Sequence, residues 1–186
     1  IFDFGKTEDA ISHFNFYFYI LALYEFALIY LFIVIFALGK NEEAISHYKM
    51  AIKIKPDFAN AHNNLGNALS AKGKNEEAIG HYKMAIKIKP DYADAYNNLG
   101  NSLQLIGRLA DAISNYRKAL QVNPKYALAL NNLGNALQEL GHFEKAVTSY
   151  KESLQLNPHY AVAHNNLGNA LRSLGRLDEA VISYRK

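Results

Sequence analysis

The chain alternates short stretches of helical hydrophobic periodicity with breaker residues, and the whole pattern returns every 34 residues. Each period holds two such stretches, the first followed by a glycine and the second by a proline. Glycine suits the turn at a helix C-terminus and proline cannot continue a helix, so this punctuation predicts pairs of short helices. The breakers are Gly73, Gly107, Gly141 and Gly175, and Pro56, Pro90, Pro124 and Pro158.

The first stretch of each period predicts an amphipathic helix. With Ala59 counted as position 1 of a unit, positions 4, 7, 8, 10 and 11 fall on one arc and are mostly apolar or small. Position 8 is always glycine, Gly66 in the first unit, although glycine inside a helix costs about 1 kcal/mol relative to alanine. A glycine that returns mid-helix predicts two backbones in close approach. One pair cannot bury its apolar face alone, so we expect stacked pairs with a continuous core.

These positions resemble the tetratricopeptide repeat, a 34-residue helix–turn–helix unit with small and aromatic residues at fixed places. The family pattern expects Leu-Gly at positions 7 and 8, which are Leu65 and Gly66 here. In the second helix it expects alanine, an aromatic residue, alanine and a closing proline, and those places hold Ala78, Tyr82, Ala85 and Pro90. The chain departs from the pattern where the family often has tryptophan at position 4 and tyrosine at position 11. Those places hold His62, Tyr96, Leu130 and His164, and Leu69, Leu103, Leu137 and Leu171.

Periodicity and resemblance together predict an all-α fold, a right-handed superhelical solenoid of stacked antiparallel helix pairs. Residues 39–58 would form the second helix of a repeat. Complete repeats would follow at 59–92, 93–126 and 127–160, with a truncated repeat at 161–186. Because the chain begins at Ile1 and ends at Lys186 inside a periodic segment, we expect a fragment of a longer protein.

Asparagine occupies positions 5, 6 and 9 of the first helix in every unit. A helical wheel places these positions opposite the packing arc, and the resemblance implies that this arc lies on a concave, partner-binding surface. An amide offers two donors and an acceptor, which suits an extended peptide backbone. At position 6 a ligand contact and a hydrogen bond between units are open alternatives, whereas at positions 5 and 9 we expect solvent or ligand. The predicted peptide-binding residues are Asn63, Asn64, Asn67, Asn97, Asn98, Asn101, Asn131, Asn132, Asn135, Asn165, Asn166 and Asn169.

The favoured function is a protein–protein interaction scaffold that binds an extended peptide segment in this asparagine-lined groove. The asparagine pattern also resembles the repeat region of O-linked N-acetylglucosamine transferases, which implies the alternative of a substrate-recruiting region whose catalytic domain lies elsewhere. A second alternative is a membrane-tethered assembly factor. Another branch of the family grips acidic C-terminal tails through Lys or Arg at positions 2, 5 and 6. We disfavour that function because these positions carry no basic residue in any complete unit.

Charge and composition argue against several classes of function. The formal net charge is +3, from 20 basic and 17 acidic side chains, and no dense basic stripe is present, so we expect no nucleic-acid partner. There are no cysteines, which excludes disulfides, thiolate catalysis and cysteine–zinc sites. The histidines follow the repeat period rather than a metal-ligand spacing, and no nucleophile–base pair stands out. We therefore expect neither an enzyme nor a bound cofactor or metal.

The N-terminal region, residues 1–38, departs from the pattern as a degenerate half repeat followed by an atypical first helix. Residues 16–38 are apolar except for Glu25 and the tyrosine hydroxyls, and their length suffices for a membrane span. They also lie within the repeat register, since Gly5 and Gly39 are one period apart. Three interpretations stay open: a membrane span, degenerate repeat helices that cap the array, or a genetic artefact such as an inverted tract. A cytoplasmic location is favoured, with a membrane-associated one as the alternative.

Overall fold

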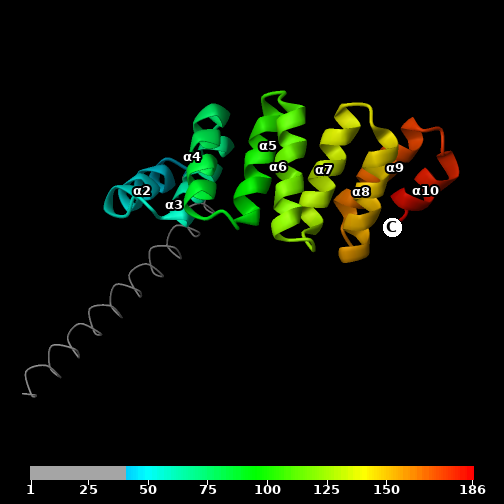
Figure 1. The fold of residues 1–186 in the computed structure, drawn as a ribbon. Helices are drawn as coiled ribbons and strands as arrows, with labels where there is room; N and C mark the ends of the chain where they lie inside the picture. Colours follow the sequence, from blue (N-terminus) through cyan, green and yellow to red (C-terminus); the bar gives the residue numbers. More distant parts are fainter. Residues whose placement is uncertain (1–40) are drawn as a thin grey trace, which may run out of the picture. The chain divides into compact units, whose positions relative to one another are not determined.

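The computed structural model describes residues 41–186, and every regular element in that range is an α-helix. The chain divides into two units, Ile1–His47 and Tyr48–Lys186, and the second carries the helix pairs (Figure 1). Helix α2 (Asn41–Ile54) crosses the boundary between the two units. The helices of the second unit are α3 (Ala59–Ala71), α4 (Asn75–Ile88), α5 (Ala93–Leu105), α6 (Leu109–Val122), α7 (Ala127–Glu139), α8 (Phe143–Leu156), α9 (Ala161–Ser173) and α10 (Leu177–Tyr184).

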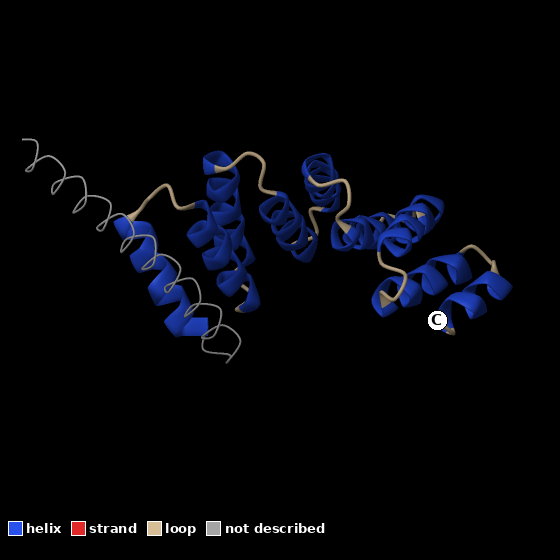
Figure 2. Ribbon diagram, turned by 90° about the horizontal axis from the view of Figure 1, so that it is seen from below, coloured by secondary structure: helices blue, strands red, loops and turns tan. Residues whose placement is uncertain are grey.

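The second unit is a stack of helix pairs. Each first helix (α3, α5, α7, α9) packs against the second helix that follows it (α4, α6, α8, α10), and each second helix except the last packs against the next first helix (Figure 2). Successive first helices also contact one another. This arrangement confirms the predicted all-α solenoid of stacked helix pairs.

The turn within each pair depends on its glycine. Gly73, Gly107, Gly141 and Gly175 have φ angles of 76°, 78°, 77° and 74°, in the left-handed region that disfavours residues with a side chain. In the first pair, the Gly73 N–H donates to the Ser70 carbonyl at 2.8 Å and the Lys74 N–H to the Leu69 carbonyl at 3.0 Å. The predicted turns at these four glycines are confirmed.

The glycine at position 8 makes room for an aromatic ring. A Cβ atom added to Gly66 would lie 2.5 Å from Cε1 of Tyr82, and one added to Gly100 would lie 2.5 Å from Cε1 of Tyr116. The remaining pairs, Gly134 with Tyr150 and Gly168 with Tyr184, repeat this contact. The expectation that two backbones meet here is therefore wrong, because the close neighbour is a tyrosine side chain from the second helix.

The apolar stretch at 16–38 and the rest of the predicted N-terminal region 1–38 lie outside the described residues. Among residues 41–186, no helix has both the length and the apolarity that a membrane crossing needs. The longest helices there have 14 residues.

Candidate functional site

The twelve predicted asparagines, hereafter the asparagine ladder, lie on the first helices, but their three positions differ in exposure. At position 5, Asn63, Asn97 and Asn131 are buried, with exposed fractions of 4%, 0% and 2%. Only Asn165, on the last first helix, is exposed. The expectation that position 5 faces solvent or ligand is wrong for the three buried residues, because the next first helix packs over this arc.

Position 6 connects each unit to the one before it. The Nδ2 group of Asn132 donates to Oδ1 of Asn97 at 3.0 Å and to Oδ1 of Asn101 at 3.1 Å. Asn166 repeats both bonds one unit later, at 3.1 Å to Asn131 and 3.0 Å to Asn135. Asn98 makes the first of them, to Asn63 at 3.1 Å. Of the two alternatives left open at position 6, the bond between units is therefore present.

The asparagine at position 9 accepts a hydrogen bond from the tyrosine whose ring packs on the glycine at position 8. The Oδ1 atom of Asn101 accepts from the Tyr116 hydroxyl at 2.8 Å, and burial raises the pKa of Tyr116 well above its ordinary value, so the donor proton stays in place. The same bond recurs in every unit: from Tyr82 to Asn67 at 2.9 Å, from Tyr150 to Asn135 at 2.7 Å and from Tyr184 to Asn169 at 2.9 Å.

These bonds use one end of each position 9 amide and leave the other free. In Asn101 and Asn135, Oδ1 accepts two hydrogen bonds, one from tyrosine and one from the next unit. Within the described range, the Nδ2 groups of the position 9 residues form no hydrogen bond, and neither do the Oδ1 atoms of Asn132 and Asn166. The half-buried ladder therefore offers both N–H donors and carbonyl acceptors to a ligand.

Two acidic groups flank the ladder in its central units. The Asp94 carboxylate, at position 2, accepts from the Tyr126 hydroxyl at 2.7 Å, and burial together with this carboxylate raises the pKa of Tyr126. Glu139, at position 13, accepts from Gln104, whose own Oε1 accepts from the Tyr116 hydroxyl at 2.9 Å. Position 2 becomes aliphatic in the later units, where Leu128 and Val162 are exposed.

Sequence reasoning missed the tyrosine hydroxyls and Gln104 as members of this network. A signal for the hydroxyls was available: tyrosine at position 24 and asparagine at position 9 share the 34-residue period, although they lie on different helices. The Gln104 contacts carry no such signal, because position 12 varies among Ser70, Gln104, Gln138 and Arg172.

Two histidines, His62 and His81, contact each other between α3 and α4. Nδ1 of His62 lies 3.1 Å from Nδ1 of His81, and Nε2 of His62 lies 3.2 Å from the Pro56 carbonyl oxygen. Burial lowers the pKa of His81, and the neighbouring His62 adds to this effect. No group of three potential metal ligands occurs in the region that the structure covers.

Models of known protein families match the repeats described above. A TPR repeat model matches residues 34–73 and 66–107, and two tetratricopeptide repeat models match residues 91–158 and 131–186. The chain belongs to the tetratricopeptide repeat (TPR) family. TPR units generally mediate protein–protein interactions, and TPR proteins are typically non-catalytic scaffolds. No curated protein matches this TPR chain.

Solved structures share the fold of the TPR chain. The crystal structure of MamA is 27% identical, with a TM-score of 0.74 over 81% of this chain and 88% of that one. PilF of Pseudomonas aeruginosa is 23% identical, with a TM-score of 0.80 over 86% of this chain and 72% of that one. YrrB, described as a TPR protein with an unusual peptide-binding site, is 20% identical, with a TM-score of 0.68 over 86% of each chain.

Proposed function

We propose that this chain is an interaction scaffold that binds an extended segment of a partner protein along the asparagine ladder. The proposal rests mainly on the unused hydrogen-bonding groups at positions 9 and 6. A peptide carbonyl can accept from the free N–H groups of Asn101 or Asn135, and a peptide N–H can donate to Oδ1 of Asn132 or Asn166. Because these contacts involve only the backbone, the ladder would tolerate many partner sequences.

The hydrogen bonds inside the ladder support this function by fixing the amides before a ligand arrives. Asn101 has its Oδ1 fixed by Tyr116 and Asn132, so its N–H groups already point away from those partners. A preorganised amide loses little rotamer freedom on binding, and such a loss costs about 0.5–1.5 kcal/mol for a mobile side chain.

The proposal can be tested by changing the donors while keeping the acceptors. In the double variant Asn101→Asp, Asn135→Asp, one carboxylate oxygen still accepts from the tyrosine and from the next unit, but the N–H groups are lost. A peptide selected from a random-sequence display library on the full chain should bind this variant about tenfold or more weakly, because its carbonyls now face a carboxylate. Fluorescence anisotropy would measure the affinities.

Asn123→Asp is the matched control. Asn123 is exposed in a loop, and its Oδ1 accepts from the Lys125 N–H at 3.1 Å, a bond that aspartate keeps. This variant makes one Asn→Asp change, half the added charge of the double variant, away from the ladder and should bind the selected peptide like the unchanged chain. If the double variant binds as tightly as the control, the ladder is not the peptide site.

A second candidate is the substrate-recruiting region of a protein O-linked N-acetylglucosamine transferase. It is favoured by the presence of asparagine at positions 5, 6 and 9 in four consecutive units. A nucleotide-sugar-binding domain encoded by the same gene would support this candidate. A complete gene without one would exclude it and leave the scaffold function.

A further inference from the structure

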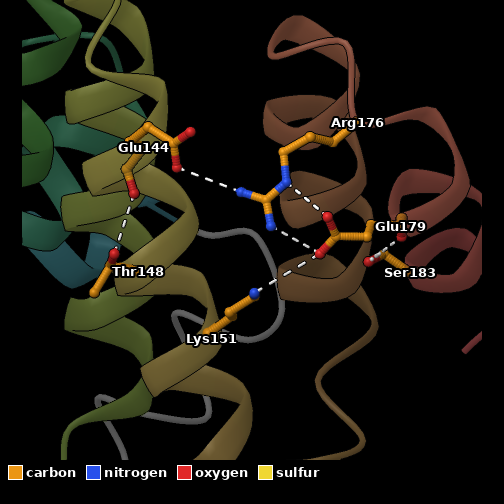
Figure 3. A network of polar contacts seen from close by, with 6 residues as sticks. All are labelled: Glu144, Thr148, Lys151, Arg176, Glu179 and Ser183. Atoms are coloured by element: carbon orange, nitrogen blue, oxygen red, sulfur yellow. Dashed lines mark hydrogen bonds and ion pairs between the residues drawn. The ribbon is translucent and has the colours of Figure 1, made fainter.

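The second helices carry an ionic network at the junction of α8 and α10 (Figure 3). Arg176 donates from Nε and Nη2 to the two oxygens of Glu179, at 2.7 and 2.8 Å, and its Nη1 lies 3.4 Å from Oε2 of Glu144. Lys151 approaches the same Glu179 carboxylate, with Nζ 4.0 Å from Oε2. Two cations and two carboxylates thus neutralise each other across the junction.

The same four places are filled with the same charges at the junction of α4 and α6. They hold Glu76, Lys83, Arg108 and Asp111, in the order of Glu144, Lys151, Arg176 and Glu179. Arg108 donates from Nε to Oδ2 of Asp111 at 2.7 Å, and Lys83 lines one surface pocket together with both of them. The alternation of two acids and two bases is therefore a repeated feature of this surface.

The junction of α6 and α8 lies between the two junctions just described and lacks both acidic residues. Its four places hold Ala110, Arg117, His142 and Lys145. All four residues are exposed, and in the part of the chain that the structure describes Arg117 and Lys145 make no ion pair. Lys145 occupies the repeat position of Glu179, so a second cation takes the place of the carboxylate that the cations share one unit later.

We propose that the surface formed by Arg117, His142 and Lys145 is a docking site for an acidic segment of a partner protein. A glutamate or aspartate side chain of the partner would supply the carboxylate that the neighbouring junctions contain. The Arg117 guanidinium can bind such a group with two parallel hydrogen bonds, as Arg176 binds Glu179, while Lys145 contributes a point charge. The site lies on the second helices and is separate from the asparagine ladder.

A protein segment fits this site better than a nucleic acid does. Arg117 and Lys145 place two cations at one junction, and the equivalent places on both sides are neutralised by Asp111 and Glu179. A nucleic-acid backbone needs a continuous row of basic residues, which these neutral junctions interrupt.

The test uses the full chain and a labelled peptide that contains six glutamates among glycine and serine, with a matched glutamine peptide. The glutamate peptide should bind at low salt and the glutamine peptide about tenfold or more weakly. Lys145→Glu rebuilds the neutral arrangement of the other junctions and should weaken binding of the glutamate peptide about five- to tenfold. Arg117→Gln should weaken it in the same direction, with circular dichroism as the check that both variants fold.

Lys83→Gln is the matched control for Arg117→Gln, since it removes one cation from the same repeat position of a junction that keeps its acids, and binding should stay within about twofold. Glu179→Lys should create a second cationic junction and strengthen binding. Equal losses in Lys83→Gln and Arg117→Gln would mean diffuse attraction to the whole chain and would overturn the site. The proposal also fails if Lys145→Glu binds like the unchanged chain, or if only a phosphoserine version of the peptide binds.

Discussion

The two faces of the helix stack are held together by different chemistry. On the first helices, short neutral amides bond directly from unit to unit, as Asn132 does to Asn97. On the second helices, within residues 41–186, the ionic bridges between units are made by long charged side chains, as Lys151 does to Glu179 at 4.0 Å. The first kind of contact is buried or half-buried, whereas Lys151 and Glu179 are exposed.

This difference explains why one face repeats strictly and the other does not. A buried amide that loses its partner costs about 1–3 kcal/mol, while an exposed ion pair contributes about 0–1 kcal/mol. Positions 5, 6 and 9 are accordingly asparagine in every unit, but the place of Glu179 is taken by aspartate at Asp111 and by lysine at Lys145. Because a substitution in an exposed ion pair of the second helices costs little stability, the junction of α6 and α8 can differ from its neighbours and serve a separate role.

The largest effect is expected where a side chain is added to the packed face. In Gly100→Ala the new Cβ would lie 2.5 Å from Cε1 of Tyr116, so the buried ring must shift, and overpacking of this kind costs about 1–3 kcal/mol. Denaturant unfolding followed by circular dichroism would measure the loss. Gly80→Ala is the control, because its Cβ meets nothing within 4 Å, and it should gain up to about 1 kcal/mol from helix propensity. Equal effects of the two variants would refute the ring contact.

A smaller effect is expected from removing one ladder amide. Asn97 is fully buried and its Oδ1 accepts from Asn132, which keeps its second acceptor, Asn101, so Asn97→Ala should destabilise the chain by about 0.5–1.5 kcal/mol. Asn165→Ala at the same repeat position, where the side chain is exposed, should change stability by about 0.5 kcal/mol or less. Both would be measured by urea unfolding. A loss as large for Asn165 as for Asn97 would contradict the distinction between buried and exposed amides.

The sequence predicted the fold well because its signals are local. Turn glycines such as Gly73 and closing prolines such as Pro90 mark chain geometry that hardly depends on the neighbouring units. The exposure of Asn97 was predicted wrongly because a helical wheel treats one helix alone, while the next first helix covers this side of α5. The shared period of Tyr116 and Asn101 shows that both recur but not that they meet, because their bond joins two helices whose mutual orientation is set by packing.

The smallest effect is expected on the ionic face. In Glu179→Gln, Arg176 and Lys151 lose their shared carboxylate, but both stay solvated, so the melting temperature should shift less than in Asn97→Ala.

The hydrogen bond from Arg176 lowers the pKa of Glu179 below its ordinary value of 4.5. The stabilisation by Glu179 is therefore present above pH 4.5 and is lost as the pH falls through the lowered pKa. Thermal melts at neutral pH and near pH 3 should accordingly differ less for Glu179→Gln than for the unchanged chain. A variant whose melting temperature falls at neutral pH as far as that of Asn97→Ala would show that this ion pair supports the stack as strongly as the buried amides, and the contrast between the two faces would be wrong.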